Sequence, residues 1–218
     1  MRAIAEDPQY QIARARMLDQ QLRTRGIHDE LVLAAMGSVP RQEFVEEQFR
    51  KEAYDDHPVP LANGQTISQP FMVALMLQAL RLQKDCTVLE IGTGTGYQAA
   101  LLAEIASRVV SVERIQGLAF AARENLKRLG IENVEVVFGD GSLGYAPRSP
   151  YDRIIVAAAA PSIPSALVDQ LPDRGVLLVP LGPSDVQVVH RITREGQQTR
   201  TELLDACRFV PLIGEQGY

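Results

Sequence analysis

Three short polar segments carry the residue types most suited to chemistry, and each follows a run of apolar residues. The first, residues 90–96, reads Glu-Ile-Gly-Thr-Gly-Thr-Gly. The second ends in Glu113, and the third is Gly139-Asp140-Gly141. Alternate glycines let the backbone turn tightly and approach a ligand closely. Glu113 lies 21 residues beyond Gly92, near the usual distance for a carboxylate that binds ribose hydroxyls. The spacing predicts a nucleotide-like cofactor.

Two cofactors suit a glycine loop of this kind, a nicotinamide dinucleotide and S-adenosylmethionine. A dinucleotide loop has the form GxGxxG, whose third glycine allows close helix packing beside a pyrophosphate. Counted from Gly92, that position is Tyr97. Glu90 would also place negative charge near a pyrophosphate, whereas the amino group and sulfonium of S-adenosylmethionine are cationic. We therefore predict the methyl donor, with Asp140 accepting from its adenine amino group and the Gly141 N–H beside it.

The three segments need a scaffold that brings them to one place, and the pattern from residue 87 onward predicts an α/β sheet. Apolar runs alternate with helical stretches, which is typical of a parallel sheet covered on both faces. Ligands of such sheets bind beyond the carboxyl ends of the strands, where all three polar segments would lie. Strands are expected at 88–91, 109–112, 134–138, 154–157 and 176–179, and helices at 97–105, 115–129 and 164–171.

The first third of the chain predicts short helices instead. Asp29 can cap a helix over residues 30–36, and Gly37 is expected to end it. A polar loop at 63–70 precedes a helix that runs to Leu80. Further upstream, apolar residues recur at helical spacing in a charged background and predict an amphipathic helix, its stripe being Ile12, Ala15, Leu18 and Leu22.

The end of the chain predicts a hairpin, because segments 186–193 and 202–210 are joined through 195–198 with no helix between them. Five alternating units plus an antiparallel hairpin resemble the Rossmann-like seven-stranded S-adenosylmethionine-dependent methyltransferase fold. The strand order comes from that resemblance and not from periodicity. We expect one domain over 1–218, in which 1–80 form a helical part with an acceptor loop and 81–218 form the cofactor-binding sheet and the hairpin.

Composition limits the classes of partner. Hydrophobic residues make up 46% of 218 residues, enough to fill a core, and the net charge of −5 argues against nucleic acid as the main partner. No apolar run is long enough to span a bilayer or to act as a signal peptide. Cys86 and Cys207 belong to no CxxC pair, so we expect isolated thiols and a cytoplasmic protein. The three histidines are scattered and predict no metal site.

Longer segments are more specific than the glycine loop. They are Gly64-Gln65-Thr66-Ile67-Ser68-Gln69-Pro70, the run from Val88 to Ala100, Ser111-Val112-Glu113-Arg114, Gly139-Asp140-Gly141, the run from Pro150 to Val156, and Arg208-Phe209-Val210-Pro211-Leu212. Through them the chain resembles, from about Met17 to Leu212, the protein-L-isoaspartate O-methyltransferases in their bacterial form. Segment 64–70 distinguishes this family from other methyltransferases, because methyltransferases in general share the glycine loop but not segment 64–70.

The resemblance implies a repair reaction. The family transfers a methyl group from S-adenosylmethionine to the α-carboxylate of an isoaspartyl residue and leaves S-adenosylhomocysteine. The ester then closes to a succinimide, and hydrolysis returns some normal aspartate. Ser68 is implied as the catalytic hydroxyl that orients the acceptor. Cofactor contacts are implied for Thr66, Ile67, Ser68, Gln69, Glu90, Gly92, Thr93, Gly94, Gly96, Glu113, Arg114, Gly139, Asp140 and Gly141.

Some alternatives stay open at this point. A methyltransferase for a small molecule or RNA, a noncatalytic module that binds the methyl donor, and a dehydrogenase each share part of the pattern. The sequence also departs from the family at Phe71, Ala157 and Arg174-Gly175, which puts details of substrate contact in question. The segment after Leu212 matches too weakly to assign its residues, although it could close the site. The expected partners are isoaspartyl proteins and peptides, and the expected state is a monomer.

Overall fold

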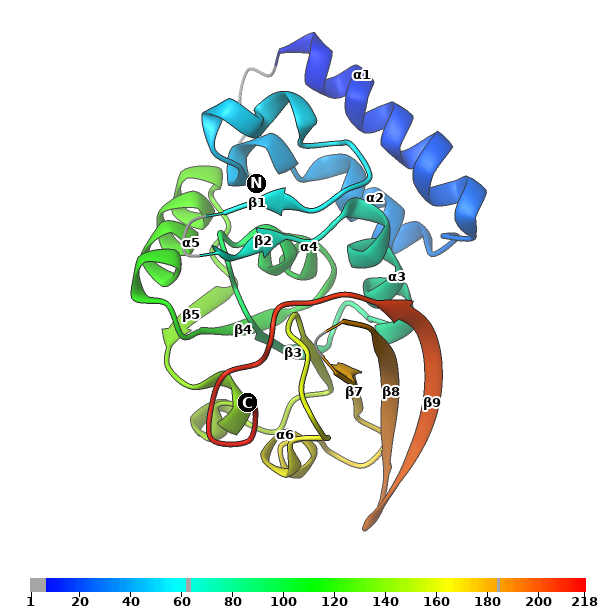
Figure 1. The fold of residues 1–218 in the computed structure, drawn as a ribbon, viewed down its shortest axis with the longest axis vertical. Helices are drawn as coiled ribbons and strands as arrows, with labels where there is room; N and C mark the ends of the chain where they lie inside the picture. Colours follow the sequence, from blue (N-terminus) through cyan, green and yellow to red (C-terminus); the bar gives the residue numbers. More distant parts are fainter. Residues whose placement is uncertain (1–6, 62–63, 184) are drawn as a thin grey trace.

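The computed structural model describes residues 7–61, 64–183 and 185–218. The first residue of the predicted polar loop, Asn63, and residues 1–6 of the expected domain lie outside these ranges. A seven-stranded sheet in the order β5-β4-β3-β6-β7-β8-β9 forms the centre (Figure 1). Its strands are β3 (Thr87–Ile91), β4 (Arg108–Glu113), β5 (Val134–Phe138), β6 (Arg153–Val156), β7 (Val176–Leu181), β8 (Gln187–Glu195) and β9 (Gln198–Cys207).

The sheet has the predicted mixed character. The pairs among β3 to β7 are parallel, and β8 and β9 form an antiparallel hairpin on the β7 edge. The predicted α/β methyltransferase fold is confirmed, including the terminal hairpin. The central strands β3, β6 and β7 are almost wholly buried because helices and loops cover both of their faces.

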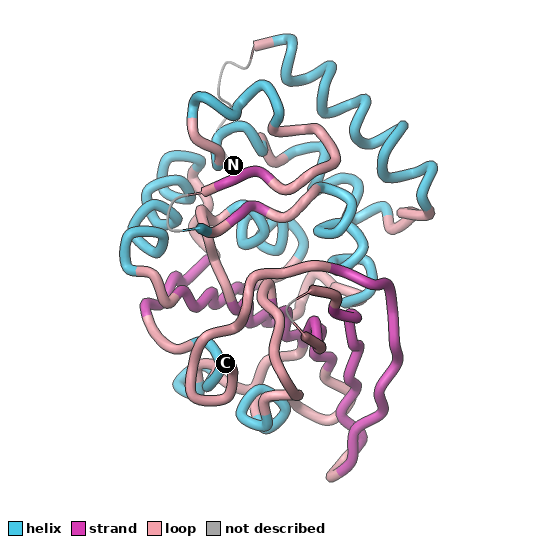
Figure 2. The backbone as a smooth tube through the Cα atoms, viewed as in Figure 1, coloured by secondary structure: helices cyan, strands magenta, loops and turns pink. Residues whose placement is uncertain are grey.

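Helices pack on the sheet in unequal layers (Figure 2). Three lie on one face, where their apolar residues share a core with the N-terminal part of the chain: α3 (Pro70–Leu80), α4 (Tyr97–Ile105) and α5 (Gln116–Leu129). The short α6 (Ser165–Asp169) covers the other face, where Leu167 packs with Leu89, Ile154 and Leu177. Gly130 ends α5 in the left-handed conformation, directly after the predicted last residue at 129.

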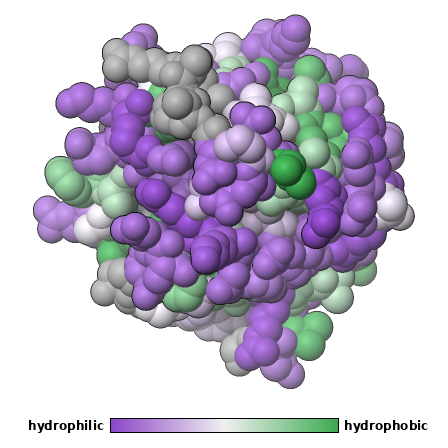
Figure 3. Space-filling view, turned by 90° about the horizontal axis from the view of Figure 1, so that it is seen from above, coloured by the Kyte–Doolittle hydropathy of each residue, from purple (hydrophilic) through white to green (hydrophobic). Residues whose placement is uncertain are grey.

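The N-terminal part adds α1 (Pro8–Arg16), a π-helix (Met17–Leu22), α2 (Glu30–Ser38), the 3-10 turns Arg23–Arg25, Arg41–Phe44 and Glu47–Glu52, and a small antiparallel pair of β1 (Val59–Pro60) and β2 (Thr66–Ile67). Seen from above, this part is largely hydrophilic with scattered apolar residues (Figure 3). Its inner side supplies much of the first core.

The predicted apolar stripe of the first helix is wrong in its first half. Ile12 is 66% exposed and Ala15 is exposed too, whereas Met17 and Leu22 are buried. The π-helix explains the difference, because a π turn holds more residues than an α turn and rotates the buried face relative to the helix before it. A single 3.6-residue period therefore does not describe both halves.

The predicted cap of α2 is correct but its predicted end is wrong. The Asp29 carboxylate accepts hydrogen bonds from the N–H groups of Leu31 and Val32. Gly37 lies inside the helix, which continues to Ser38 and ends in extended backbone at Val39. A glycine ends a helix when it turns to a left-handed conformation, and the chain makes no such turn here.

Candidate active site

The glycine loop follows β3 and leads into α4, as the sequence predicts. Gly92, Gly94 and Gly96 all have positive φ angles, of 92°, 56° and 95°. L-residues with side chains rarely adopt this conformation, so glycine is required at each turn of the loop. A Cβ at Gly92 would make ordinary van der Waals contact with Ala157 after strand β6, so the positive φ angle and not crowding requires glycine there. The loop therefore leaves a backbone surface open to a ligand.

Glu90 stands at the base of this loop on β3 and is fully buried. Its Oε2 accepts a hydrogen bond of 2.5 Å from Ser111 on β4, and Ser111 in turn lies 2.6 Å from the Thr93 hydroxyl. Burial raises the pKa of Glu90 to about 8, an effect that the Ser111 hydrogen bond offsets only in part. The buried carboxylate therefore favours a proton or a nearby cation.

Polar atoms around the loop lack partners within the described residues. Glu90 Oε1, Thr95 Oγ1 and Gln98 Nε2 are buried and make no hydrogen bond of ordinary geometry there, although the Gln98 amide lies near enough to Glu90 to lower the pKa of its carboxyl. Buried polar groups are almost always paired, so three such atoms beside one loop indicate a site that a polar ligand completes. These three atoms include a donor, the Gln98 amide, and an acceptor on the Glu90 carboxylate, which a nearby cation would stabilise.

Glu113 at the end of β4 faces the same loop. Its Oε2 accepts from the Gly94 N–H at 2.9 Å and its Oε1 from the Ile115 N–H at 2.8 Å. Only 5% of the residue is exposed. Each carboxylate oxygen has more than one acceptor site, so both can still bind ligand hydroxyls. The two backbone bonds fix the carboxylate against the loop.

The segment around Ser68 forms the opposite wall. Ser68 is half-buried, and its hydroxyl makes no hydrogen bond to any described residue; the N-cap position of α3 belongs to Gln69, without a side-chain bond. Ser68 is therefore not held as a helix cap, and its hydroxyl is available to a ligand. Asp56 caps α3 instead, because its carboxylate accepts from the Phe71 N–H at 3.1 Å.

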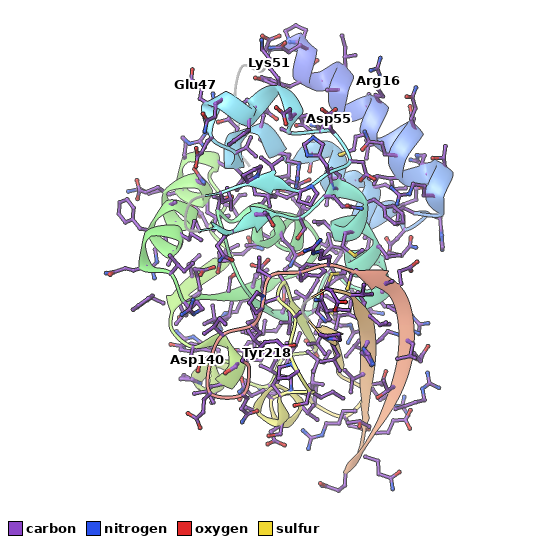
Figure 4. The ribbon with its side chains drawn as sticks, in the orientation of Figure 1. Arg16, Glu47, Lys51, Asp55, Asp140 and Tyr218 are labelled. Carbon is purple, nitrogen blue, oxygen red and sulfur yellow. The ribbon has the colours of Figure 1, made fainter. Side chains whose placement is uncertain are left out.

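Asp140, which the sequence predicts to accept from the adenine amino group, also makes protein contacts that the sequence does not predict. Its Oδ1 accepts from the N–H and the hydroxyl of Ser142, and its Oδ2 accepts from the N–H of Glu215 at 2.8 Å. Burial alone would raise the pKa of Asp140, but these donors outweigh it and hold the pKa below its ordinary value. The carboxylate thus binds the C-terminal segment, and Asp140 and Tyr218 lie at the same end of the molecule (Figure 4).

That segment, residues 210–218, forms a strap across the site. Its backbone pairs with Ala159 beyond β6, and the Gln216 N–H donates to Ser142 Oγ at 3.0 Å. The Tyr218 hydroxyl donates to the Gly182 carbonyl at 2.7 Å. Sequence reasoning left these residues unassigned, because their partners lie 74 and 36 positions away and leave no local pattern.

One cavity joins these parts and holds about 1000 Å³ of free space, part of it open to solvent. Among the residues singled out from the sequence, its lining includes Thr66, Ile67, Ser68, Gly92, Thr93, Gly94, Glu113, Arg114 and Gly141. Five others stand behind the lining or outside it: Gln69, Glu90, Gly96, Gly139 and Asp140. The cavity also has apolar walls that sequence reasoning missed, from Leu61, Val73, Val112, Ile115, Leu118, Ala158 and residues 210–213.

Comparison with known proteins places the chain. A model of the protein-L-isoaspartate(D-aspartate) O-methyltransferase family matches residues 13–217. The chain belongs to this family. The family assignment agrees with the resemblance drawn from segment 64–70 and the glycine loop.

Individual relatives of this family member share about half of its sequence. The protein-L-isoaspartate O-methyltransferase of Methanoculleus marisnigri is 52% identical over 206 residues, which cover 94% of this chain and 93% of the relative. That of Koribacter versatilis is 49% identical over 209 residues, covering 96% and 94%. Both matches run through almost the whole of each chain.

Solved structures match in shape as well. A chain described as protein-L-isoaspartate O-methyltransferase superposes with a TM-score of 0.85 at 31% identity, covering 94% of this chain and 67% of that one. A Plasmodium falciparum protein, described as a putative member and solved in complex with S-adenosyl-L-homocysteine, gives 0.79 at 28% identity, covering 94% and 98%.

The described residues also bear on membrane insertion and on metal binding. No helix among them is long and apolar enough to cross a membrane. Within the same ranges, no group of three or more histidine, cysteine, aspartate or glutamate side chains is placed to hold a metal ion.

Proposed function

We propose that this family member transfers the methyl group of S-adenosylmethionine to the α-carboxylate of L-isoaspartyl residues in damaged proteins and peptides. The ester then closes to a succinimide, whose hydrolysis returns part of the material to L-aspartate. One observation carries the proposal: a single cavity has the glycine loop and Glu113 on one wall and the Ser68 segment on the other. This arrangement occurs in a chain that the family model matches over residues 13–217.

The residues around the loop fit this cofactor. Burial raises the pKa of the Glu90 carboxyl, and the Ser111 hydroxyl and the Gln98 amide offset that effect only in part. A ligand with an amino group and a sulfonium supplies positive charge there. Glu113, fixed by two backbone N–H groups, can accept from ribose hydroxyls. We assign the adenine end to Gly141 and the apolar wall of Ile115 and Leu118.

The protein's part in the reaction is alignment. When bound, S-adenosylmethionine supplies an electrophilic methyl group, and a carboxylate is already a competent nucleophile, so no general base is required. The Ser68 hydroxyl donates to one acceptor oxygen and leaves the other to react. Apolar residues of the wall, such as Leu61 and Leu212, exclude water. Proximity of this kind is worth up to about 7–11 kcal/mol in favourable cases.

The setting of the reaction is part of the proposal. We propose that the protein acts in the cytoplasm on isoaspartyl proteins and peptides, as a monomer. Two buried cysteines that form no disulfide, Cys86 and Cys207, suit a reducing compartment. The net charge of −5 favours protein over nucleic-acid partners.

The deciding experiment is methyl transfer from labelled S-adenosylmethionine to two peptides that differ only in isoaspartate against aspartate. We expect base-labile label on the isoaspartyl peptide alone. Label on both peptides would reject repair specificity. Label on neither, with the cofactor bound, would reject the acceptor and leave the cofactor site standing.

A further inference from the structure

Arg41 is the most unusual charged residue of the molecule outside the cavity lining. It begins the 3-10 turn Arg41–Phe44 and is fully buried. Within the described ranges, no carboxylate lies at ion-pair distance from its guanidinium, and its Nη1 has no hydrogen-bond partner. Burial lowers the pKa of Arg41, and Tyr97, Tyr54 and the Asp56 carboxylate oppose that effect. Arginine stays charged in proteins, so this buried cation is compensated only in part, by the more distant Asp56 carboxylate.

The guanidinium joins the two walls of the cavity from behind. Its Nη2 donates to the Ser68 carbonyl at 2.8 Å, and its Nε donates to the Ala53 carbonyl at 2.6 Å. Its central carbon lies 4.7 Å from the centre of the Tyr97 ring. Tyr97 is the first residue of α4, directly after the glycine loop. One side chain therefore contacts both the Ser68 segment and the first residue after the cofactor loop.

A buried cation without a carboxylate at ion-pair distance is costly unless it has a function or a transient partner. The acceptor in the proposed reaction is a carboxylate, and it would bind on the Ser68 side of the cavity. Low local polarity strengthens the attraction between that anion and the guanidinium. We propose that Arg41 is a positioning residue for this reaction: it orients Ser68 through its carbonyl, and its charge favours an anionic acceptor. This inference rests on the proposed function.

The test compares two peptides that differ only at the acceptor, an isoaspartyl peptide and the same peptide with a neutral α-carboxamide. The wild type is expected to bind the carboxylate form more tightly, which inhibition constants measure. In Arg41→Met this preference should fall about tenfold or more, and kcat should fall because Ser68 is no longer held. Arg41→Lys keeps the charge but not the two-carbonyl geometry, so it should retain the preference and lose kcat.

A merely structural role would give a different result, since both peptides would then bind more weakly by the same factor. Arg191→Met is the matched control, because Arg191 is also nearly buried and donates to the Ala79 carbonyl, yet lies on β8. Arg191→Met should change the stability of the protein without changing the preference for the carboxylate over the carboxamide peptide. An unchanged preference in Arg41→Met would overturn the inference. If Arg41→Met does not fold, loss of the preference in Arg41→Lys would overturn it instead.

The same measurements separate this inference from the proposed function. Wild-type protein that does not methylate the isoaspartyl peptide rejects the function before any variant is needed. Wild-type protein that methylates it while Arg41→Met keeps the full carboxylate preference rejects only the role of Arg41. S-adenosylmethionine affinity, measured for each variant, should stay within about threefold of the wild-type value, because Glu113 and the glycine loop are held together by hydrogen bonds that do not involve Arg41.

Discussion

At the scale of single residues, the Ser68 hydroxyl lines the cavity without a hydrogen-bond partner among the described residues. Ser68→Ala removes the group that we propose aligns the acceptor and leaves the glycine loop intact. We expect kcat for the isoaspartyl peptide to fall about 100-fold, as misalignment can cost that much, with cofactor affinity nearly unchanged. Ser38→Ala, which removes a hydroxyl bound to the Ala35 carbonyl, is the control. Equal loss of rate and cofactor affinity would contradict the role of Ser68.

Glu90 makes the stability of the cofactor-free protein depend on pH. Burial raises its pKa from 4.5 to about 8, so the folded protein holds a proton that the unfolded chain has already lost. Raising the pH from about 5 to 8 must then lower the free energy of unfolding, by up to about 1.4 kcal/mol per pH unit for a single group. Glu90→Gln cannot ionise and should lack this part of the pH dependence. Thermal unfolding at pH 6 and pH 9 without cofactor measures the difference, and parallel curves would contradict it.

At the scale of elements, the strap of residues 210–218 is held to the loop after β5 through Asp140 and Ser142. Ser142→Ala removes the bond to the Gln216 N–H and one of the donors to Asp140. We expect the strap to open more readily and the cofactor to dissociate several times faster. Stopped-flow release measures the rate. Ser149→Ala, an exposed serine bound only to the Ala146 carbonyl, should leave it unchanged.

Elements whose signal is local were predicted well from the sequence. The glycine loop, the cap at Asp29 and the final hairpin each depend on residues close together in the chain, so their patterns survive folding. The buried face of the first helix was predicted wrongly, since the π-helix Met17–Leu22 changes the helical period and Ile12 is exposed. The strand order also required the resemblance, because periodicity says nothing about which strands are neighbours.

At the scale of the whole molecule, cofactor binding should couple to global stability. A ligand at 100 times its dissociation constant adds about 2.7 kcal/mol to the free energy of unfolding, which corresponds to roughly 5–10 °C in Tm for a chain of this size. We expect S-adenosylhomocysteine to produce this shift and NAD to produce none. Differential scanning fluorimetry across ligand concentrations measures it. A shift with NAD of the same size would favour a dinucleotide site after all.

The contacts that complete the candidate site were beyond sequence reasoning for a common physical reason. Arg41 reaches Ser68 across 27 positions, and Ser142 reaches Gln216 across 74. Such pairs form only once the chain is folded, and neither partner shows it in its local sequence. Sequence reasoning also missed that residues 210–213 line the cavity. Segment 208–212 was noted only for its resemblance to the family.

Two segments of the cavity lining, 66–68 and 210–213, are far apart in the sequence, while Gly92, Glu113 and Gly141 come from between them, and we expect both segments to contact the acceptor. Recombination within a gene at any point between the two segments would therefore combine one half of an acceptor wall with a foreign other half. Lineages that keep one acceptor class are expected to inherit the two segments as a matched pair. Attempts to transplant acceptor specificity between relatives must exchange both.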